Sequence, residues 1–200
     1  MKPKEFEYLI DALKILPSVS SKSADKIAHC ILNMDDEVYS AFIKRIVDAR
    51  INIKLCIYCN NITSNSLSCE ICSNIDRQNK TLCVVTTVDD LYKIEKANSF
   101  FGTYYVLQNE VNYKNKESIK KIDLTKLEQT INKFGINEIL IATNMTVNGE
   151  LTCNYVKQYL LEKQLKLDFY RLGLGIPFNA SIDYIDWESL KFSIKNKNKI

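Results

Sequence analysis

Hydrophobic positions recur at helical spacing over the first quarter of the chain. Three segments show this pattern, namely 4–15, 24–32 and 36–50. Pro17 ends the first predicted helix, and either Ser21 or Ser23 can cap the second. Two short helices joined by a tight turn predict a helix-hairpin-helix, which is followed by a third amphipathic helix.

The hydrophobic period changes after residue 80. Apolar runs of strand length alternate with helical patterns, which predicts a parallel sheet covered by helices on both faces. The predicted strands are 81–87, 103–107, 137–143 and 166–172, and the predicted helices between them are 88–98, 123–134 and 152–164. The most apolar strand, 137–143, fits the centre of the sheet, and the polar stretch 108–121 is predicted to be a loop. A short amphipathic helix is predicted near Trp187.

A cluster of cysteines separates these two halves of the chain. The stretch CIYCNNITSNSLSCEIC, residues 56–72, contains two Cys-x-x-Cys pairs. Each such turn can aim both thiolates at one point, and two turns complete the tetrahedron of sulfur ligands that Zn²⁺ prefers. The predicted ligands are Cys56, Cys59, Cys69 and Cys72. Four protein ligands leave no position for water, so the predicted zinc is structural.

Three other interpretations of these cysteines stay open at this point. Two disulfides would require an oxidising compartment. A redox-active Cys-x-x-Cys usually occurs singly, at the junction of a strand and a helix. A four-cysteine iron–sulfur site usually has a tighter run of cysteines.

Composition indicates a globular protein with a real core, since 46% of the residues are hydrophobic and 26% are charged. The chain opens MKPKEFEYLI, so we expect no signal peptide, and no stretch approaches the roughly 18 apolar residues of a membrane span. Cysteines without an export signal predict reduced thiols and a cytoplasmic location. Outside the cluster, Cys30, Cys83 and Cys153 are expected to be small buried residues.

The net charge of +3 permits nucleic-acid binding without arguing for it. A hairpin turn can offer backbone N–H groups to a DNA phosphate, helped by the N-terminus of its second helix. Lys22 and Lys26 lie one turn apart at the start of that helix and could reach the same phosphate backbone. The alternative is a plain helical hairpin with solvated lysines.

The order of these motifs resembles the bacterial recombination mediator family RecR, over roughly residues 6–194. The segment LPSVSSKSADKIA is similar to the Leu-Pro-Gly-x-Gly-x-Lys-Ser-Ala hairpin of the family, and the four cysteines match its zinc ligands. Asp76-Arg77 matches the Asp-Arg pair that follows those ligands. CVVTTVDDLYKIE, FGTYYVL and ILIATNMTVNGELTCNYV resemble later blocks, which belong to its Toprim domain.

The resemblance implies an α/β protein of four parts. These are a helix-hairpin-helix domain at 1–53, a Cys₄ zinc finger at 54–78, a Toprim domain with a parallel sheet at 79–174 and a short C-terminal helical region at 175–200.

The resemblance also implies a function without catalysis. Family members bind DNA without sequence preference and act with RecO, RecF or both to load RecA on single-stranded DNA. They assemble into dimers or tetrameric rings. Of the two predicted DNA contacts, Lys22 matches the hairpin lysine of the family, and Lys26 stands where an arginine is usual.

The sequence departs from the family at positions that bear on function. Ser18 and Ser20 replace the two hairpin glycines, and Thr86 stands where Toprim enzymes carry a metal-binding glutamate. The segment ATNMTVNGE also lacks the Asp-x-Asp that holds Mg²⁺ in such enzymes.

Two alternative functions remain open. One is a Toprim-type Mg²⁺-dependent nuclease or topoisomerase that uses Asp89, Asp90 and Glu150, although the two aspartates are expected to cap a helix. The other is a protein-interaction scaffold that has lost DNA binding.

Overall fold

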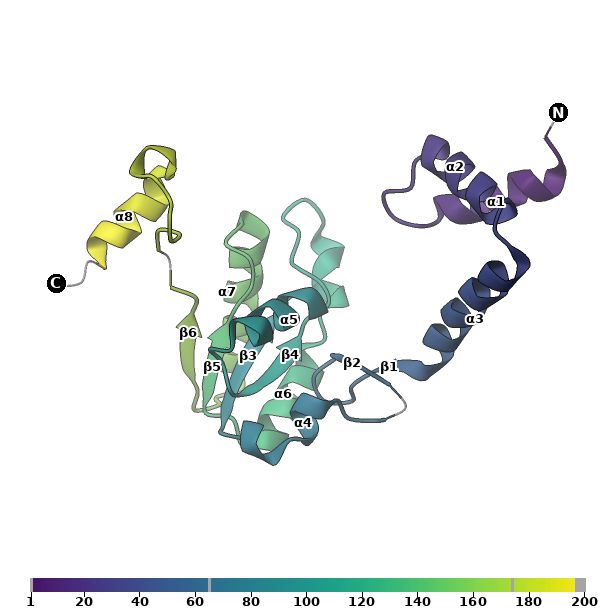
Figure 1. The fold of residues 1–200 in the computed structure, drawn as a ribbon. Coiled ribbons are helices and arrows are strands. Elements are labelled where there is room, and N and C mark those ends of the chain that lie inside the picture. Colours follow the sequence, from purple (N-terminus) through teal and green to yellow (C-terminus); the bar gives the residue numbers. More distant parts are fainter. Residues whose placement is uncertain (1, 65, 174, 197–200) are drawn as a thin grey trace. The chain divides into compact units, whose positions relative to one another are not determined.

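The computed structural model describes residues 2–64, 66–173 and 175–196. Its contacts divide the chain after Ile53 into two compact units. The N-terminal unit is entirely helical, and the C-terminal unit holds the cysteine cluster together with a parallel sheet (Figure 1). Each unit is described by itself.

The N-terminal unit is the predicted helix-hairpin-helix followed by a third helix. Its elements are α1 (Lys4–Lys14), α2 (Ser21–Leu32) and α3 (Asp36–Asn52). The first two helices pack through Phe6, Ala24 and Ala28, which are buried. The small alanines let the helices approach closely, and the Phe6 ring lies 4.8 Å from the His29 ring.

In the hairpin turn, one of the two serines that replace the family's glycines adopts a backbone conformation typical of glycine. Ser18 has a φ of +64°, the left-handed conformation that glycine adopts at little cost, whereas Ser20 has an ordinary φ of −72°. Ser20 is also the residue that caps α2, because its hydroxyl accepts a hydrogen bond from the Ser23 amide at 3.2 Å. The prediction of Ser21 or Ser23 as the cap was therefore wrong.

Helix α3 has the predicted apolar face, but nothing in the described part of its own unit buries it. Val38, Phe42 and Ile46 on this face are 53%, 39% and 52% exposed, and no residue of the helix is buried. An amphipathic helix normally buries such a stripe, so α3 presents an uncovered apolar surface.

The C-terminal unit is built on a four-stranded parallel sheet, as predicted. Its strands are β3 (Thr81–Val85), β4 (Thr103–Val106), β5 (Glu138–Ile141) and β6 (Asp168–Arg171), in the order β4-β3-β5-β6. The most apolar strand is central, as its sequence predicted. Strand β4 lies at one edge, which matters for the cysteine cluster below.

Helices cover both faces of this sheet. Helices α6 (Leu124–Phe134) and α7 (Val147–Glu162) pack on the face that contains Leu82 and Val84. Helix α5 (Val88–Ala97) packs on the other face. Successive strand residues point to opposite faces, so a continuous apolar run serves two cores at once.

Helix α7 begins at Val147 rather than at the predicted 152. Thr146 caps it, since its hydroxyl accepts a hydrogen bond from the Gly149 amide at 3.1 Å. A Cβ atom at Gly149 would lie 2.0 Å from the backbone oxygen of Asn144, so only glycine fits there. The helix thus starts directly against the carboxyl end of β5.

The remaining elements are short. They are β1 (Ile53–Leu55), β2 (Ile62–Ser64), α4 (Glu70–Ser73), the 3₁₀ helices η1 (Ile75–Arg77), η2 (Lys116–Lys121) and η3 (Ile182–Tyr184), and α8 (Trp187–Lys195). Strands β1 and β2 form a small separate sheet. The predicted C-terminal helix is confirmed as α8.

An ion pair ties η1 to α5. Arg77 donates to both carboxylate oxygens of Glu95, at 2.9 and 2.6 Å, and also to the carbonyl of Gly102 at 3.0 Å. The side chains are only 17% and 26% exposed. The bidentate contact with Arg77 lowers the pKa of Glu95 below its ordinary value of 4.5.

We expect Glu95→Gln to lower the free energy of unfolding by about 2 kcal/mol at pH 7, because it removes a charge-assisted pair. A carboxylate with a depressed pKa stabilises the fold above its unfolded-state value of 4.5 and loses that contribution as pH falls through the lower folded-state value. Urea unfolding at pH 7 and at pH 3 should therefore show the gap between variant and wild type closing in acid. A gap of equal size at both pH values would contradict this assignment.

Candidate metal centre and nucleic-acid interface

The four predicted ligands come together in space. The sulfur atoms of Cys56, Cys59, Cys69 and Cys72 all lie within 4.8 Å of one another, and all four residues are buried. The sulfurs of Cys59 and Cys69 are 3.5 Å apart. A tetrahedral centre with Zn–S bonds of about 2.3 Å has sulfurs about 3.8 Å apart, so the arrangement fits a four-sulfur metal ion.

The structure contradicts the alternative of two disulfides, because all seven cysteines are free thiols. Backbone amides instead point at the sulfurs. The Asn61 amide donates to the sulfur of Cys59, and the Cys69 amide donates to the sulfur of Cys56, both at 3.4 Å. Such bonds favour the thiolate form, which is the form that binds metal.

Neighbouring thiols act in the same direction on one ligand. Hydrogen bonds from the thiols of Cys59, Cys69 and Cys72 hold the pKa of Cys56 well below its usual range. The other thiols of the cluster thus favour the metal-binding thiolate form at Cys56.

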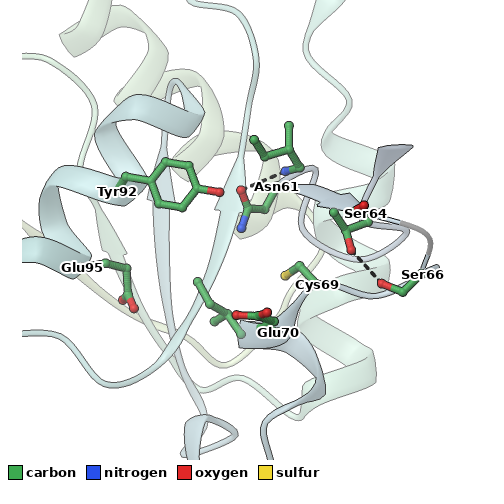
Figure 2. A pocket seen from close by; sticks show the side chains of 10 residues that line it. Asn61, Ser64, Ser66, Cys69, Glu70, Tyr92 and Glu95 are labelled. Atoms are coloured by element: carbon green, nitrogen blue, oxygen red, sulfur yellow. Dashed lines mark hydrogen bonds between the residues drawn. The ribbon is translucent and has the colours of Figure 1, made fainter. Parts of the chain in front are cut away.

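A pocket of about 440 Å³ opens beside the second cysteine pair. Figure 2 shows the Cys69 side chain at this pocket, with Glu70 next to it and Tyr92 and Glu95 on the side of α5. A hydrogen bond from the Ile62 amide to Asn61 Oδ1, at 2.8 Å, fixes the rim of the pocket. Cys69 is the one ligand candidate among the residues that line this pocket, so an ion or a chelator could approach the cluster from this side.

The carboxyl edge of the sheet carries a different network from that of a Toprim enzyme. Thr86 donates to Glu110 at 3.1 Å, and Asn144 donates to the same carboxylate oxygen at 2.9 Å. Asp90 accepts hydrogen bonds from the backbone and hydroxyl of Thr87 in a capping box, as expected for a helix start.

The acidic residue Glu150 is paired as well, with Arg171 at 2.7 Å. Arg171 also binds the carbonyls of Ile141 and Thr143, both at 2.7 Å, and so closes the end of β5. Within the described residues, the cysteine cluster is the only close group of three or more potential metal-binding side chains. The predicted trio Asp89, Asp90 and Glu150 does not come together.

The two candidate DNA contacts lie on the first turns of α2. Lys22 and Lys26 are both exposed, and the first turn of this helix holds no acidic residue. Asp25 lies between them but pairs with Lys2. Neither Lys22 nor Lys26 forms an ion pair with another described residue, so both ammonium groups are available at the positive end of the helix dipole.

Several residues of these sites were not apparent in the sequence. Glu110 lies in the stretch predicted as a loop, and Lys126 lies on α6, where it donates to the cysteine turn at Cys56 and Asn60. An isolated polar residue in a loop or on a helix surface gives no signal of its own. Of the three cysteines expected to be buried, only Cys83 is, since Cys30 is exposed on α2 and Cys153 is partly buried.

Family models match both units of the chain. A model described as RecR, helix-hairpin-helix, matches residues 6–50, and a model of the Toprim domain matches residues 80–172. Together with the four-cysteine cluster between them, these matches define the class: a helix-hairpin-helix protein with a Toprim domain.

Relatives that align over nearly the whole chain identify the family. Recombination protein RecR of Ureaplasma urealyticum serovar 10 is 44% identical over 199 residues, which cover 100% of this chain and 98% of the relative. The protein of the same name from Francisella tularensis subsp. tularensis strain SCHU S4 is 31% identical over 192 residues, or 96% and 94% of the two chains. The chain belongs to the RecR family, and membership places it among the mediators of recombinational repair.

In the part of the chain that the structure describes, every helix is too short or too polar to cross a membrane.

Proposed function

We propose that this protein is a non-enzymatic DNA clamp that acts with RecO, RecF or both to help load RecA on single-stranded DNA. The observation that carries the proposal is the free hairpin surface of Lys22 and Lys26 in a chain that resembles RecR from end to end. Lysines at a helix N-terminus suit phosphate contacts, which are independent of base sequence. The cytoplasm, where thiols stay reduced, is the proposed location.

The proposed clamp is a homo-oligomer, either a dimer or a tetrameric ring. Helix α3 supports this proposal, because its apolar face with Phe42 and Ile46 is open to solvent in the single chain. A second copy that covers this face would remove apolar surface from water. Sedimentation analysis of the purified protein would test the oligomeric state.

The proposed cofactor is one structural zinc ion held by Cys56, Cys59, Cys69 and Cys72. Their buried, mutually close sulfurs support a closed four-sulfur site, which suits a structural role. Zinc would cross-link the two Cys-x-x-Cys turns and would supply no reaction step. Iron can occupy the same sulfurs, so metal analysis of the purified protein is the direct test.

The absence of enzymatic activity is part of the proposal. Glu110 is bound by Thr86 and Asn144, and Glu150 by Arg171, so these carboxylates are engaged in hydrogen bonds at the sheet edge. Supercoiled plasmid incubated with protein and Mg²⁺ should remain intact. If the wild type nicks or relaxes the plasmid and Glu110→Gln abolishes this activity, the protein is a Toprim-type nuclease or topoisomerase and the proposed clamp function is wrong.

DNA binding by the zinc-loaded protein tests the central claim. We expect binding to single-stranded DNA of unrelated sequences, alone or with RecO, that weakens steeply between low and physiological salt because counterions are released. A folded, zinc-loaded protein that binds RecO but no DNA in either condition would reduce the function to that of an interaction scaffold. The division at 53, 78 and 174 stays a prediction that limited proteolysis can test.

A further inference from the structure

The turn that carries Cys56 and Cys59 is held from outside by helix α6. The carbonyl of Cys56 accepts a hydrogen bond from Lys126 Nζ at 3.1 Å, and the carbonyl of Tyr58 accepts one from Thr130 Oγ1 at 2.7 Å. The Tyr58 ring also packs edge-on against Phe134, with ring centroids 5.4 Å apart. Two carbonyl groups of this turn are thus bound by side chains of one helix, α6.

The same turn covers the C-terminal end of the open edge strand. Strand β4 is an edge strand, so its outward backbone groups have no neighbouring strand. Val106 directs both of its backbone groups to the turn: its amide donates to the Cys59 carbonyl at 2.8 Å, and its carbonyl accepts from Asn60 Nδ2 at 2.9 Å. The turn that carries Cys56 and Cys59 therefore supplies the missing partner at Val106, the last residue of β4.

Asn60 joins these two sets of contacts. Its amide nitrogen binds Val106, while its Oδ1 accepts a hydrogen bond from Lys126 Nζ. Asn60 is 6% exposed and has a φ of +60°, a conformation that asparagine tolerates better than most residues. The side chain of Asn60 is therefore buried, its nitrogen and its oxygen both form hydrogen bonds, and its backbone is left-handed. These three features together indicate that Asn60 positions the turn.

The positive charge of Lys126 suits a site that holds one zinc ion and four thiolates. Four thiolates around one divalent cation carry a net negative charge. An ammonium group bound to the backbone of one ligand stabilises that charge, and more strongly in a partly buried site than in water. No acidic side chain among the described residues forms an ion pair with Lys126.

We propose that Lys126 and Asn60 are positioning residues of the metal centre, and we call them the Lys126–Asn60 clasp. The clasp holds the Cys56–Cys59 turn in its metal-binding conformation and couples metal occupancy to the order of the β4 edge. This inference rests on the metal site proposed above. Changes to outer-shell residues typically weaken metal binding by about 10- to 100-fold.

Two variants test the clasp. Lys126→Met keeps most of the aliphatic stem and removes the charge, while Asn60→Gly removes the side chain and accepts a φ of +60°. Each should release zinc to a colorimetric chelator about tenfold faster than wild type. Each should also shift the thiolate-to-metal charge-transfer band of the cobalt-loaded protein. Lys121→Met, which removes an exposed lysine without a side-chain partner among the described residues, is the matched control and should behave as wild type.

Amide hydrogen exchange gives a second readout at one position. The Val106 amide donates outward to the turn, whereas the Leu107 amide donates inward to the Val85 carbonyl at 2.9 Å. We expect the Val106 amide to exchange about tenfold faster in both variants and in zinc-free wild type, because its acceptor loses its fixed place. The Leu107 amide is the internal reference and should change little.

Unchanged zinc release together with unchanged Val106 exchange in both variants would overturn the clasp. Because the two side chains share one hydrogen bond, the double variant should release zinc at nearly the rate of either single variant, and fully multiplicative effects would count against a joint role. A folded wild-type protein without bound metal would refute the metal assignment alone. The rate of hydrogen exchange at the Val106 amide in the two variants would then still test whether Lys126 and Asn60 hold the turn.

Discussion

Cys59→Ser is expected to lower the free energy of unfolding by about 4 kcal/mol or more and to abolish stoichiometric zinc binding. Cys59 contributes a buried sulfur 3.5 Å from that of Cys69, and its carbonyl holds the edge of the sheet through Val106. A serine hydroxyl is a poor ligand for a sulfur-preferring site. The spacer between the cysteine pairs is polar, and the apolar side chains that pack against the four cysteines, Tyr58, Ile71 and Phe134, are only partly buried.

Metal analysis and urea unfolding would measure both parts of this prediction. Cys30→Ser is the matched control, since it makes the same substitution at an exposed cysteine outside the cluster and should change neither quantity. Treatment of the wild type with a strong chelator should reproduce the loss of stability, and added zinc should restore it. A Cys59→Ser protein that keeps one zinc ion and wild-type stability would show that the four sulfurs are not a metal site.

The double substitution Lys22→Ala and Lys26→Ala is expected to weaken DNA binding about 10- to 100-fold at low salt. It should also flatten the plot of log affinity against log salt by slightly less than two units, because each phosphate contact contributes about 0.7 to 0.9. Fluorescence anisotropy with labelled single-stranded DNA over a series of salt concentrations would measure both effects.

A charge-matched control separates specific contacts from the loss of net charge. Lys121→Ala with Lys166→Ala removes two exposed lysines from the C-terminal unit and should leave the salt slope close to that of wild type. If the hairpin variant binds DNA as the wild type does, α2 is not the contact. If both double variants weaken binding equally, the attraction is a property of the whole surface.

The sheet could be predicted from the sequence because its signal is local. Each strand is a short apolar run bounded by polar residues, and each covering helix has one apolar face, so the alternation alone specified a parallel arrangement. The most apolar strand, β5, lies between two others in the sheet, as its composition indicated. The cysteine spacing likewise predicted which four sulfurs would meet.

What the sequence did not reveal depends on distant contacts. The pairing of Glu110 with Thr86 and Asn144 joins three loops at one edge of the sheet, and no spacing rule connects them. In the sequence, Lys126 has the pattern of an ordinary residue on a helix surface. In the structure it contacts a turn about 70 residues earlier in the chain. Helix ends were also inexact, because Ser20 and Thr146 each offered a cap next to other plausible caps.

The contact between Val106 and the cysteine turn has a consequence for the handling of the protein. An uncovered edge strand is a template for pairing with the same strand of another molecule, and aggregation often starts at such edges. The sequence of β4, Thr-Tyr-Tyr-Val, is rich in residues that favour strand pairing. If the turn holds a metal ion as proposed, treatment with a chelator is expected to uncover the backbone of Val106 at this edge and to promote association, which light scattering would detect.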